Sequence, residues 1–341
     1  MMDKPYVTVG EIAEHLGCQV LGNKNKKIFE ISLYQDSNED SLTYVPYQKI
    51  NQIPDIGAGA ILTKISIGLP LHRNYIICKH EPHEMLPDVI AFLIEKRLYG
   101  CEVSGKPMLS ETSEVAETVS IQNGAIIGDH TILSPGVSIG RNVKIGSHCV
   151  IGANTVIGDH CTIGDDVQIG TCCSIGTENF EYHKFQDEWR KIPAIGTVSI
   201  GNHVRIGGNV VIEKGTIGTT TIGDFTQIDN LVQIGHEAKI GIQCHIVSLV
   251  AIAGWAEIGN YVDIYGQSAI SNHVKIGDHS ILLARSGVDK DVDQNMVISG
   301  FPAQQHRNEL KYQAFLRKLF RKNTKATTEI YTLSLHDALP I

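Results

Sequence analysis

The chain has 341 residues, of which 42% are hydrophobic and 19% charged, a composition typical of a folded globular protein rather than a disordered one. Its net charge of −8 and pI near 6.0 argue against a general affinity for nucleic acid. Thirty-three glycines beside only 6% aromatic residues favour many short strands and tight turns over a helical bundle.

The N-terminal part, residues 1–105, has no internal repeat and combines strand-like and helix-like stretches, so we expect a separate α/β domain here. Residues 1–17 lack the apolar segment of a secretion signal, and no run of eighteen apolar residues follows anywhere in the chain. We therefore expect a cytoplasmic protein. The eight cysteines include no C-x-x-C pair, so neither a zinc ribbon nor a disulfide framework is indicated, and we expect no metal.

Residues 106–301 carry the strongest signal, an aliphatic residue at every sixth position. The series runs from Ile121 to Ile175, returns at Ile200 and, after a slip of four residues, continues from Ile222 to Val288. A period of six fits neither a helix nor a simple amphipathic strand, but it is typical of a parallel β-helix built from hexapeptides. The sequence therefore predicts a mainly β fold in which three hexapeptides form each coil.

Each hexapeptide begins with the aliphatic residue, usually continues with Gly, and has a small or β-branched residue at its fifth position. Because residues two apart along a strand share a face, the fifth and first positions are expected to point inward together. Cys149, Cys161 and Cys173 occupy fifth positions, so we interpret them as core residues without chemistry. Residues eighteen apart should stack, about 4.8 Å from one coil to the next.

The histidines separate into two groups. Most of those in the repeat stand at the fourth position, where a polar corner residue is expected, whereas His236 stands at the third. Gly254 follows it by eighteen residues, and Gly218 precedes it by eighteen if the slip falls between Ile212 and Thr216. The fourth-position histidines are His130, His148, His160, His203, His273 and His279.

These small neighbours leave space beside an imidazole whose ordinary pKa suits a general base, and they leave the N–H of Gly254 approachable as an oxyanion donor. Asp229, seven residues before His236, either orients the ring or is an exposed residue at a strand end. His273 stacks with Glu237 and Trp255 about two coils, or roughly 10 Å, from His236. It is therefore either a second substrate contact or a solvated corner residue.

Two further segments flank or interrupt the repeat. Residues 177–195 form an aromatic and charged insertion that either carries binding residues or is a simple bulge. Residues 302–326 predict a basic helix, which either attracts an acidic partner or only solvates its outer face while Leu316 and Phe320 pack inward. Residues 327–341 continue no pattern and are expected to be a non-native tail. The basic residues are Arg307, Lys311, Arg317, Lys318, Arg321, Lys322 and Lys325.

IDNLVQIGHEAKIG at 228–241 and AGWAEIGNYVDIYGQSAISNHVKIG at 253–277 resemble the UDP-3-O-acylglucosamine N-acyltransferases of lipid A biosynthesis. The resemblance extends more loosely over residues 5–322, including TVGEIAEHLG near the N-terminus. It implies a left-handed β-helix in a homotrimer, a uridine-nucleotide-binding domain at 1–105, and transfer of a 3-hydroxyacyl chain to the 2-amino group of UDP-3-O-(3-hydroxyacyl)glucosamine. The donor would be an acyl carrier protein with its phosphopantetheine, and no other cofactor or nucleic acid is implied. Any contact with the inner membrane is expected to be peripheral.

The same resemblance implies roles for individual residues. His236 would be the general base, Gly254 the oxyanion donor, Asp229 the support of the base, and His273 a substrate contact. Where the family's uracil site has an aromatic, an amide and a tyrosine, this chain has Tyr44, Tyr47 and Ile50, so only stacking on Tyr44 is kept. The substrate-binding residues expected in this way are His273, Tyr44, Tyr47, Asn230, Gln233 and Glu237.

Other functions remain open on the sequence alone. An acetyl-CoA-dependent sugar N-acetyltransferase would share the repeat and the histidine, but it would not need the N-terminal domain. A non-catalytic β-helix used for assembly would leave the unusual position of His236 unexplained. A γ-type carbonic anhydrase needs three histidines converging on zinc, and the predicted stacking provides no such trio around His236.

Overall fold

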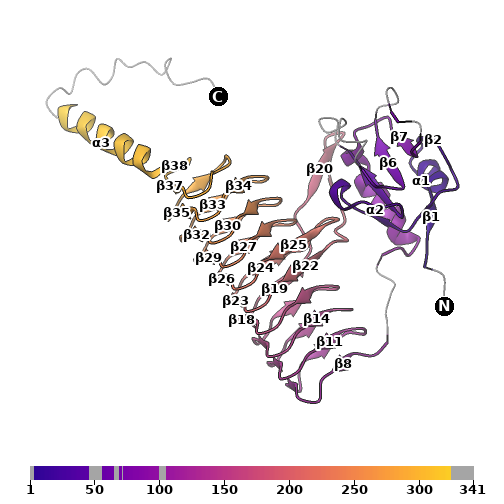
Figure 1. Ribbon diagram of the computed structural model, residues 1–341, viewed down its shortest axis with the longest axis horizontal. Coiled ribbons are helices and arrows are strands. Elements are labelled where there is room, and N and C mark those ends of the chain that lie inside the picture. Colours follow the sequence, from indigo (N-terminus) through magenta and orange to yellow (C-terminus); the bar gives the residue numbers. More distant parts are fainter. Residues whose placement is uncertain (1–3, 46–55, 65–68, 71, 100–104, 324–341) are drawn as a thin grey trace.

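The computed structural model describes residues 4–45, 56–64, 69–70, 72–99 and 105–323. A β-helix makes up most of the molecule, the N-terminal domain lies beside it next to strand β20, and helix α3 extends from its C-terminal end (Figure 1). Mainly β architecture built from stacked parallel strands is thus confirmed. None of the described helices is long and apolar enough to cross a bilayer.

The N-terminal domain is built on a sheet in the order β2-β7-β6-β5-β4, in which only β2 and β7 are antiparallel. Its first helix starts at a capping box, because the Thr8 hydroxyl accepts from the Glu11 N–H while the Glu11 carboxylate accepts from the Thr8 N–H. The elements are β1 (Val7–Thr8), α1 (Val9–His15), β2 (Gln19–Leu21), β3 (Lys27–Ile28), β4 (Glu30–Ile31), β5 (Ser41–Tyr44), β6 (Ala60–Thr63), β7 (Tyr75–Ile77) and α2 (Leu86–Glu95), with 3₁₀ helices at Tyr34–Asp36 and Pro82–Met85.

Three parallel sheets form the faces of the β-helix. The first contains β8 (Met108–Leu109), β11 (Ile126–Ile127), β14 (Lys144–Ile145), β17 (Thr162–Ile163), β22 (Thr197–Ile200), β25 (Thr219–Ile222), β28 (Lys239–Ile240), β31 (Glu257–Ile258) and β34 (Lys275–Ile276). The second contains β9 (Glu114–Val115), β12 (Ile132–Leu133), β15 (Val150–Ile151), β18 (Gln168–Ile169), β23 (Arg205–Ile206), β26 (Gln227–Ile228), β29 (His245–Ile246), β32 (Asp263–Ile264), β35 (Ile281–Leu282) and β37 (Val297–Ser299), and ends in antiparallel β38 (Gln304–Gln305). The third contains β10 (Ser120–Ile121), β13 (Ser138–Ile139), β16 (Val156–Ile157), β19 (Ser174–Thr177), β24 (Val211–Glu213), β27 (Gln233–Ile234), β30 (Ala251–Ile252), β33 (Ala269–Ile270) and β36 (Gly287–Val288).

The hexapeptide positions behave as the period predicts. Ile127 pairs with Ile145, eighteen residues on, and the first and fifth positions of successive hexapeptides form one continuous buried core that includes the three cysteines. Several buried hydroxyls at the fifth position are satisfied internally, as at Thr131, which donates to the Gly146 carbonyl and accepts from the Cys149 N–H, whereas the hydroxyl of Thr220 has no hydrogen-bond partner among the described residues.

The fourth position of most hexapeptides adopts left-handed backbone geometry, including Glu237 (φ 52°), Trp255 (φ 62°) and His273 (φ 62°). The chain turns each corner of the coil at this residue, and its side chain stacks on the equivalent residue of the next coil. The rings of Trp255 and His273 are stacked in this way with their centroids 5.9 Å apart. This turn explains why Asn, His and Asp are frequent at the fourth position.

The insertion at 177–195 is an antiparallel hairpin of β20 (Tyr182–Phe185) and β21 (Glu188–Lys191). Arg190 of this hairpin binds Asp88 of α2 at 2.5 Å, and the buried side chain of Ile192 packs into the core of the N-terminal domain. Ile217, from the four-residue slip, packs against the same core. The insertion and the slip therefore fasten the N-terminal domain to the β-helix.

The helix expected at 302–326 is α3 (His306–Asn323). Leu316 is half-buried, whereas Leu310, Tyr312 and Phe315 are 55%, 53% and 58% exposed in the single chain. The side chains of Phe320, Arg321 and Lys322 lie outside what the structure describes, as do Lys325 and residues 327–341.

Candidate active site

His236 occupies the corner that follows β27, and its side chain is buried, with 8% of the residue exposed. Gly254 lies against the imidazole as the eighteen-residue spacing predicts. A Cβ atom at Gly254 would stand 2.6 Å from Nε2 and 2.8 Å from Cε1 of His236. Only glycine at position 254 therefore leaves room for the ring in its present position, in which Nε2 is directed at the Gly254 backbone.

Third-position residues elsewhere show how unusual this pair is. In several coils an Asp or Asn at the third position accepts a hydrogen bond from the N–H of the third-position residue one coil earlier, as Asp278 does from Asn260 at 2.7 Å. Gly254 has no side chain to do this, and the His236 N–H donates to Oε2 of Glu213 at 3.2 Å instead. The Gly254 N–H makes no hydrogen bond within the described residues, so it is available to a ligand.

Glu237 holds the other side of the imidazole. Its Oε2 accepts from Nδ1 of His236 at 2.6 Å, while its Oε1 accepts from the backbone N–H groups of Ile217 and Gly218 at 3.0 and 3.1 Å. Only 2% of Glu237 is exposed. Every carboxylate oxygen thus has a donor, and the hydrogen bond directs the proton to Nδ1 and leaves the Nε2 lone pair free.

Two further carboxylates surround the ring. Oε2 of Glu181, from the inserted hairpin, lies 3.8 Å from Nδ1 of His236 and accepts from the hydroxyl of Thr216. Burial lowers the pKa of His236, but the hydrogen bond and charge of Glu237, followed by the charges of Glu181 and Glu213, outweigh it, so the pKa lies above its ordinary value. Burial raises the pKa of both Glu181 and Glu213.

Glu181, His236 and Glu237 each present one ligand atom within 4.8 Å of the others, which is close enough to hold a cation. A cation there would have to displace the 2.6 Å hydrogen bond between Nδ1 and Glu237. The arrangement therefore suits an imidazole that is held in one orientation and can lose its proton better than it suits a metal centre.

A cavity of about 480 Å³ lies between the N-terminal domain and the β-helix, next to this cluster. Leu33 and Ser32 line it on the domain side, and Glu237, Trp255 and Lys239 line it on the β-helix side. A ligand in this cavity would contact both parts of the chain near His236.

Comparisons with known proteins identify the repeat and its family. Residues 118–153 and 142–177 match the model of the bacterial transferase hexapeptide (six repeats). The chain is 54% identical over 129 residues to UDP-3-O-acylglucosamine N-acyltransferase 1 of Gloeobacter violaceus, a match that spans 38% of this chain and 37% of that relative. It is 40% identical to UDP-3-O-acylglucosamine N-acyltransferase of Fusobacterium nucleatum over 94% of this chain and 98% of that relative.

The chain belongs to the UDP-3-O-acylglucosamine N-acyltransferase family. The resemblance noted in the sequence and the classification as an acyltransferase are thereby confirmed. Among solved structures, UDP-N-acetylglucosamine O-acyltransferase of Moraxella catarrhalis is 27% identical, with 68% of this chain and 86% of that chain covered at a TM-score of 0.44.

In this member of the N-acyltransferase family, some of the expected site residues lie away from His236. Asp229 lies at the preceding corner, after β26, where its Oδ1 accepts from both nitrogens of Asn230 at 2.7 Å. Within the described part of one chain, Asp229 makes no hydrogen bond or ion pair with His236. The carboxylate that holds the ring is Glu237, which we had expected to face the substrate.

Other expected residues are connected to the cluster. Gln233 donates to Oε1 of Glu213 at 3.2 Å. His273 lies one coil beyond Gly254, with its N–H donating to the Gly254 carbonyl at 3.3 Å. Burial raises the pKa of Tyr44 and the charges of Glu181 and Glu237 raise it further, which places this tyrosine near the acidic cluster. Tyr47 and Ile50 lie outside the described residues.

Sequence reasoning missed Glu181, Glu213 and Thr216. The four-residue slip after Ile212 was a usable signal for Glu213 and Thr216, because the extra residues must leave the coil at the corner next to His236. Glu181 had no comparable signal, since it reaches the ring from an insertion that has no repeat register.

Proposed function

We propose that this chain transfers a 3-hydroxyacyl group from acyl carrier protein to the 2-amino group of UDP-3-O-(3-hydroxyacyl)glucosamine, with His236 as general base. The observation that carries the proposal is the position of Nε2 of His236 against the Gly254 backbone, while Nδ1 donates to Glu237. Family membership supports the reaction class, because the relative from Fusobacterium nucleatum bears the name of this activity.

In the proposed reaction, the substrate amine attacks the thioester carbonyl carbon and Nε2 accepts a proton from the amine nitrogen. The carbonyl oxygen becomes an oxyanion, to which the N–H of Gly254 donates. The C–S bond then breaks, and the imidazolium returns its proton to the departing thiolate sulfur. Glu237 stabilises the imidazolium between these two steps, and no metal or further cofactor is needed in this scheme.

The acids around His236 serve this proton relay. They raise the pKa of the ring, which makes it a stronger base once deprotonated and stabilises the imidazolium that protonates the thiolate. Asp229 lies at a different corner from His236, so we propose that its support reaches the ring across the subunit interface of a homotrimer. Asn230 at that corner would contact substrate in the same interface.

We further propose that the β-helix is left-handed and that the chain assembles as a homotrimer in the cytoplasm, as the family resemblance implies. The exposed apolar residues Leu310, Tyr312 and Phe315 of α3 support assembly, because such side chains are usually covered in the working state. Basic residues on the same helix would attract an acidic acyl carrier protein.

We assign nucleotide binding to the N-terminal domain. The cavity of about 480 Å³ supports this, because it joins residues of the domain to Glu237 and Trp255 beside the proposed base. Tyr44, near the acidic cluster, would stack on the uracil ring, and His273 would contact a more distant part of the acyl substrate.

The test is an assay of the purified chain with 3-hydroxyacyl carrier protein and UDP-3-O-acylglucosamine, in parallel with acetyl-CoA and an amino sugar nucleotide. We expect amide formation only with the carrier-bound donor, and a loss on the order of 10²- to 10⁴-fold in His236→Ala. His203→Ala is the matched control, because His203 is a corner residue stacked on Phe225. Activity with acetyl-CoA alone would show the chain to be a sugar N-acetyltransferase, and full activity of His236→Ala would refute the mechanism.

A further inference from the structure

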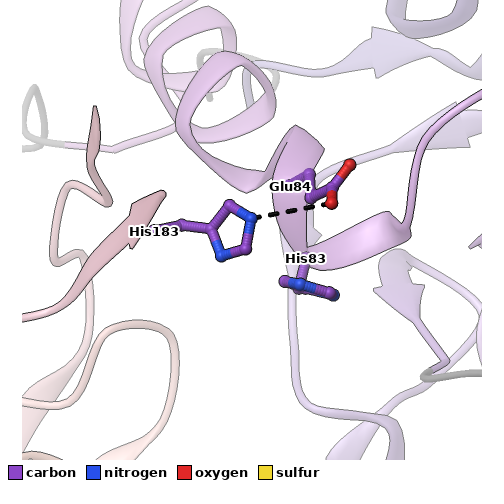
Figure 2. Close-up of side chains that lie close together, drawn as sticks. All are labelled: His83, Glu84 and His183. Carbon is purple, nitrogen blue, oxygen red and sulfur yellow. Dashed lines mark ion pairs between the residues drawn. The ribbon is translucent and has the colours of Figure 1, made fainter. Parts of the chain in front are cut away.

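A second cluster of metal-binding side chains lies between the N-terminal domain and the inserted hairpin. His83 and Glu84 belong to the 3₁₀ helix Pro82–Met85, and His183 belongs to β20 (Figure 2). Each offers one ligand atom, and these atoms lie within 4.8 Å of one another. None of the three belongs to the site around His236.

The imidazole of His183 faces Glu84 and His83 in a geometry close to coordination. Its Nε2 lies 3.7 Å from Oε1 of Glu84, which is too far for a hydrogen bond, and the rings of His83 and His183 meet edge to face at 4.6 Å between centroids. Nε2 of His183 is buried and has no hydrogen-bond partner among the described residues. A buried ring nitrogen that faces a carboxylate at this distance leaves room for a cation to bind both groups.

The distances suit zinc. With zinc bonds of 2.0–2.1 Å and tetrahedral geometry, ligand atoms lie about 3.3 Å apart. The 3.7 Å between Glu84 and His183 therefore needs to close by only a few tenths of an ångström.

His80 lies beside the cluster and is not one of its three ligand groups. Its Nδ1 lies 3.7 Å from Oε2 of Glu84, and its half-exposed ring meets Phe185 of the hairpin edge to face at 5.3 Å. Two imidazoles and one carboxylate are a ligand set that zinc accepts, with water in the fourth tetrahedral position.

The cluster also lies where the hairpin contacts the N-terminal domain. His183 is directly opposite Arg190 in the hairpin, and Arg190 binds Asp88, four residues after Glu84. The same strand region carries Glu181, which contacts the acidic cluster at His236. Whatever fastens His183 to Glu84 therefore also fixes the segment that delivers Glu181.

We propose that His83, Glu84 and His183 bind a zinc ion that fastens the β20–β21 hairpin to the N-terminal domain. The ion links two segments of the chain, and its ligands are distinct from the residues proposed for acyl transfer. It goes beyond the proposed function and does not depend on it.

The test uses untagged, full-length protein stripped of metal with a chelator and titrated calorimetrically with Zn²⁺. We expect one tight zinc ion per chain, lost in His83→Ala/His183→Ala and retained in the matched control His130→Ala/His148→Ala, another close histidine pair with rings 5.1 Å apart. Retention in His236→Ala would show that the ion does not occupy the cluster of Glu181, His236 and Glu237. Co²⁺ in place of Zn²⁺ should give the intense visible bands of a tetrahedral site.

Glu84→Gln provides a second measurement if the double alanine variant fails to fold. It removes the charged ligand while preserving size, so binding should weaken by at least about tenfold, and added Zn²⁺ should no longer raise Tm as it does in the unaltered chain. Equal zinc binding by the unaltered chain, His83→Ala/His183→Ala and Glu84→Gln would overturn the proposal. Absence of tight binding in the unaltered chain would overturn it as well.

Discussion

Oε2 of Glu237 lies 2.6 Å from Nδ1 of His236, so the proposed base is oriented by its own neighbour in the chain. Adjacent residues rarely face each other in a strand, because their side chains point to opposite faces. Here the corner intervenes, and the left-handed backbone of Glu237 brings its carboxylate beside the imidazole. Ile217 and Gly218 then fix the carboxylate from the four-residue slip.

Replacement of Glu237 by Gln should shift the pH dependence of catalysis. The charge of Glu237 raises the pKa of His236, so its removal lets the base lose its proton at lower pH, and the acid limb of kcat/KM moves down. Turnover should also fall, roughly 10- to 10²-fold, because one amide oxygen cannot serve both His236 and the two backbone donors. Glu257→Gln, which removes an exposed partner of Lys275, is the control. An unchanged pH profile for Glu237→Gln would contradict the role of this carboxylate.

The pair of His236 and Glu237 should also make the stability of the folded chain depend on pH. The folded pKa of His236 lies above its ordinary value of 6.5, so the folded chain binds the proton more tightly than the unfolded chain. The stabilising contribution is therefore complete below about 6.5 and is lost as pH rises through the folded pKa. The difference in Tm between the unaltered chain and His236→Gln should shrink as the pH is raised from 6 to about 9. A difference that grows with pH would show that His236 is held neutral.

Gly254→Ala should remove activity while leaving the fold intact. The new Cβ would stand 2.6 Å from Nε2 of His236, and the ring must turn away because the coil backbone cannot move. We expect at least about a 10²-fold loss of kcat with little change in Tm. Gly266→Ala is matched to it, since Gly266 is also a third-position residue and a Cβ there would meet Ser248 no closer than 3.2 Å. Comparable losses in both variants would point to general damage to the coil.

His273→Ala should raise KM more than it lowers kcat, because His273 lies one coil beyond Gly254 and too far from the reacting atoms for proton transfer. The control is His279→Ala, which removes a ring stacked on Tyr261 just as His273 is stacked on Trp255. Steady-state kinetics with both substrates varied would separate the effects. A fall in kcat at unchanged KM would instead place His273 in the chemical step.

Charge reversal on α3 should change the kinetics with the carrier-bound donor and not those with the sugar nucleotide. Arg317→Glu/Lys318→Glu should lower kcat/KM for the carrier-bound donor by roughly tenfold at low salt, flatten its salt dependence, and leave KM for the sugar nucleotide unchanged. Lys106→Glu/Lys144→Glu makes the same change in net charge just before β8 and in β14, near the N-terminal end of the β-helix, and should have little effect. Identical carrier kinetics in both variants across the salt range would assign α3 to assembly only.

The period of six predicted what lies inside the β-helix and what stacks along it. Ile127 and Cys149 are buried, and Gly254 lies on His236, because backbone hydrogen bonds between coils hold the register that the repeat sets. The repeat could not predict Glu181, whose position depends on how the hairpin folds back against the domain. Nor could it predict which residues of the preceding coil contact Glu237. The four-residue slip changes the separation of paired residues from eighteen to twenty-two, as between Ile212 and Ile234.

Pairing at eighteen residues also limits how the length of this protein can change. Loss or gain of one whole turn, such as residues 127–144, would shorten or lengthen the rod by about 4.8 Å and leave every remaining pair in register. Loss of a single hexapeptide would move every later strand to the neighbouring sheet of the β-helix. Because His236 and Gly254 are on successive turns near the C-terminal end, whole-turn changes far from them alter the reach of the molecule without disturbing its chemistry.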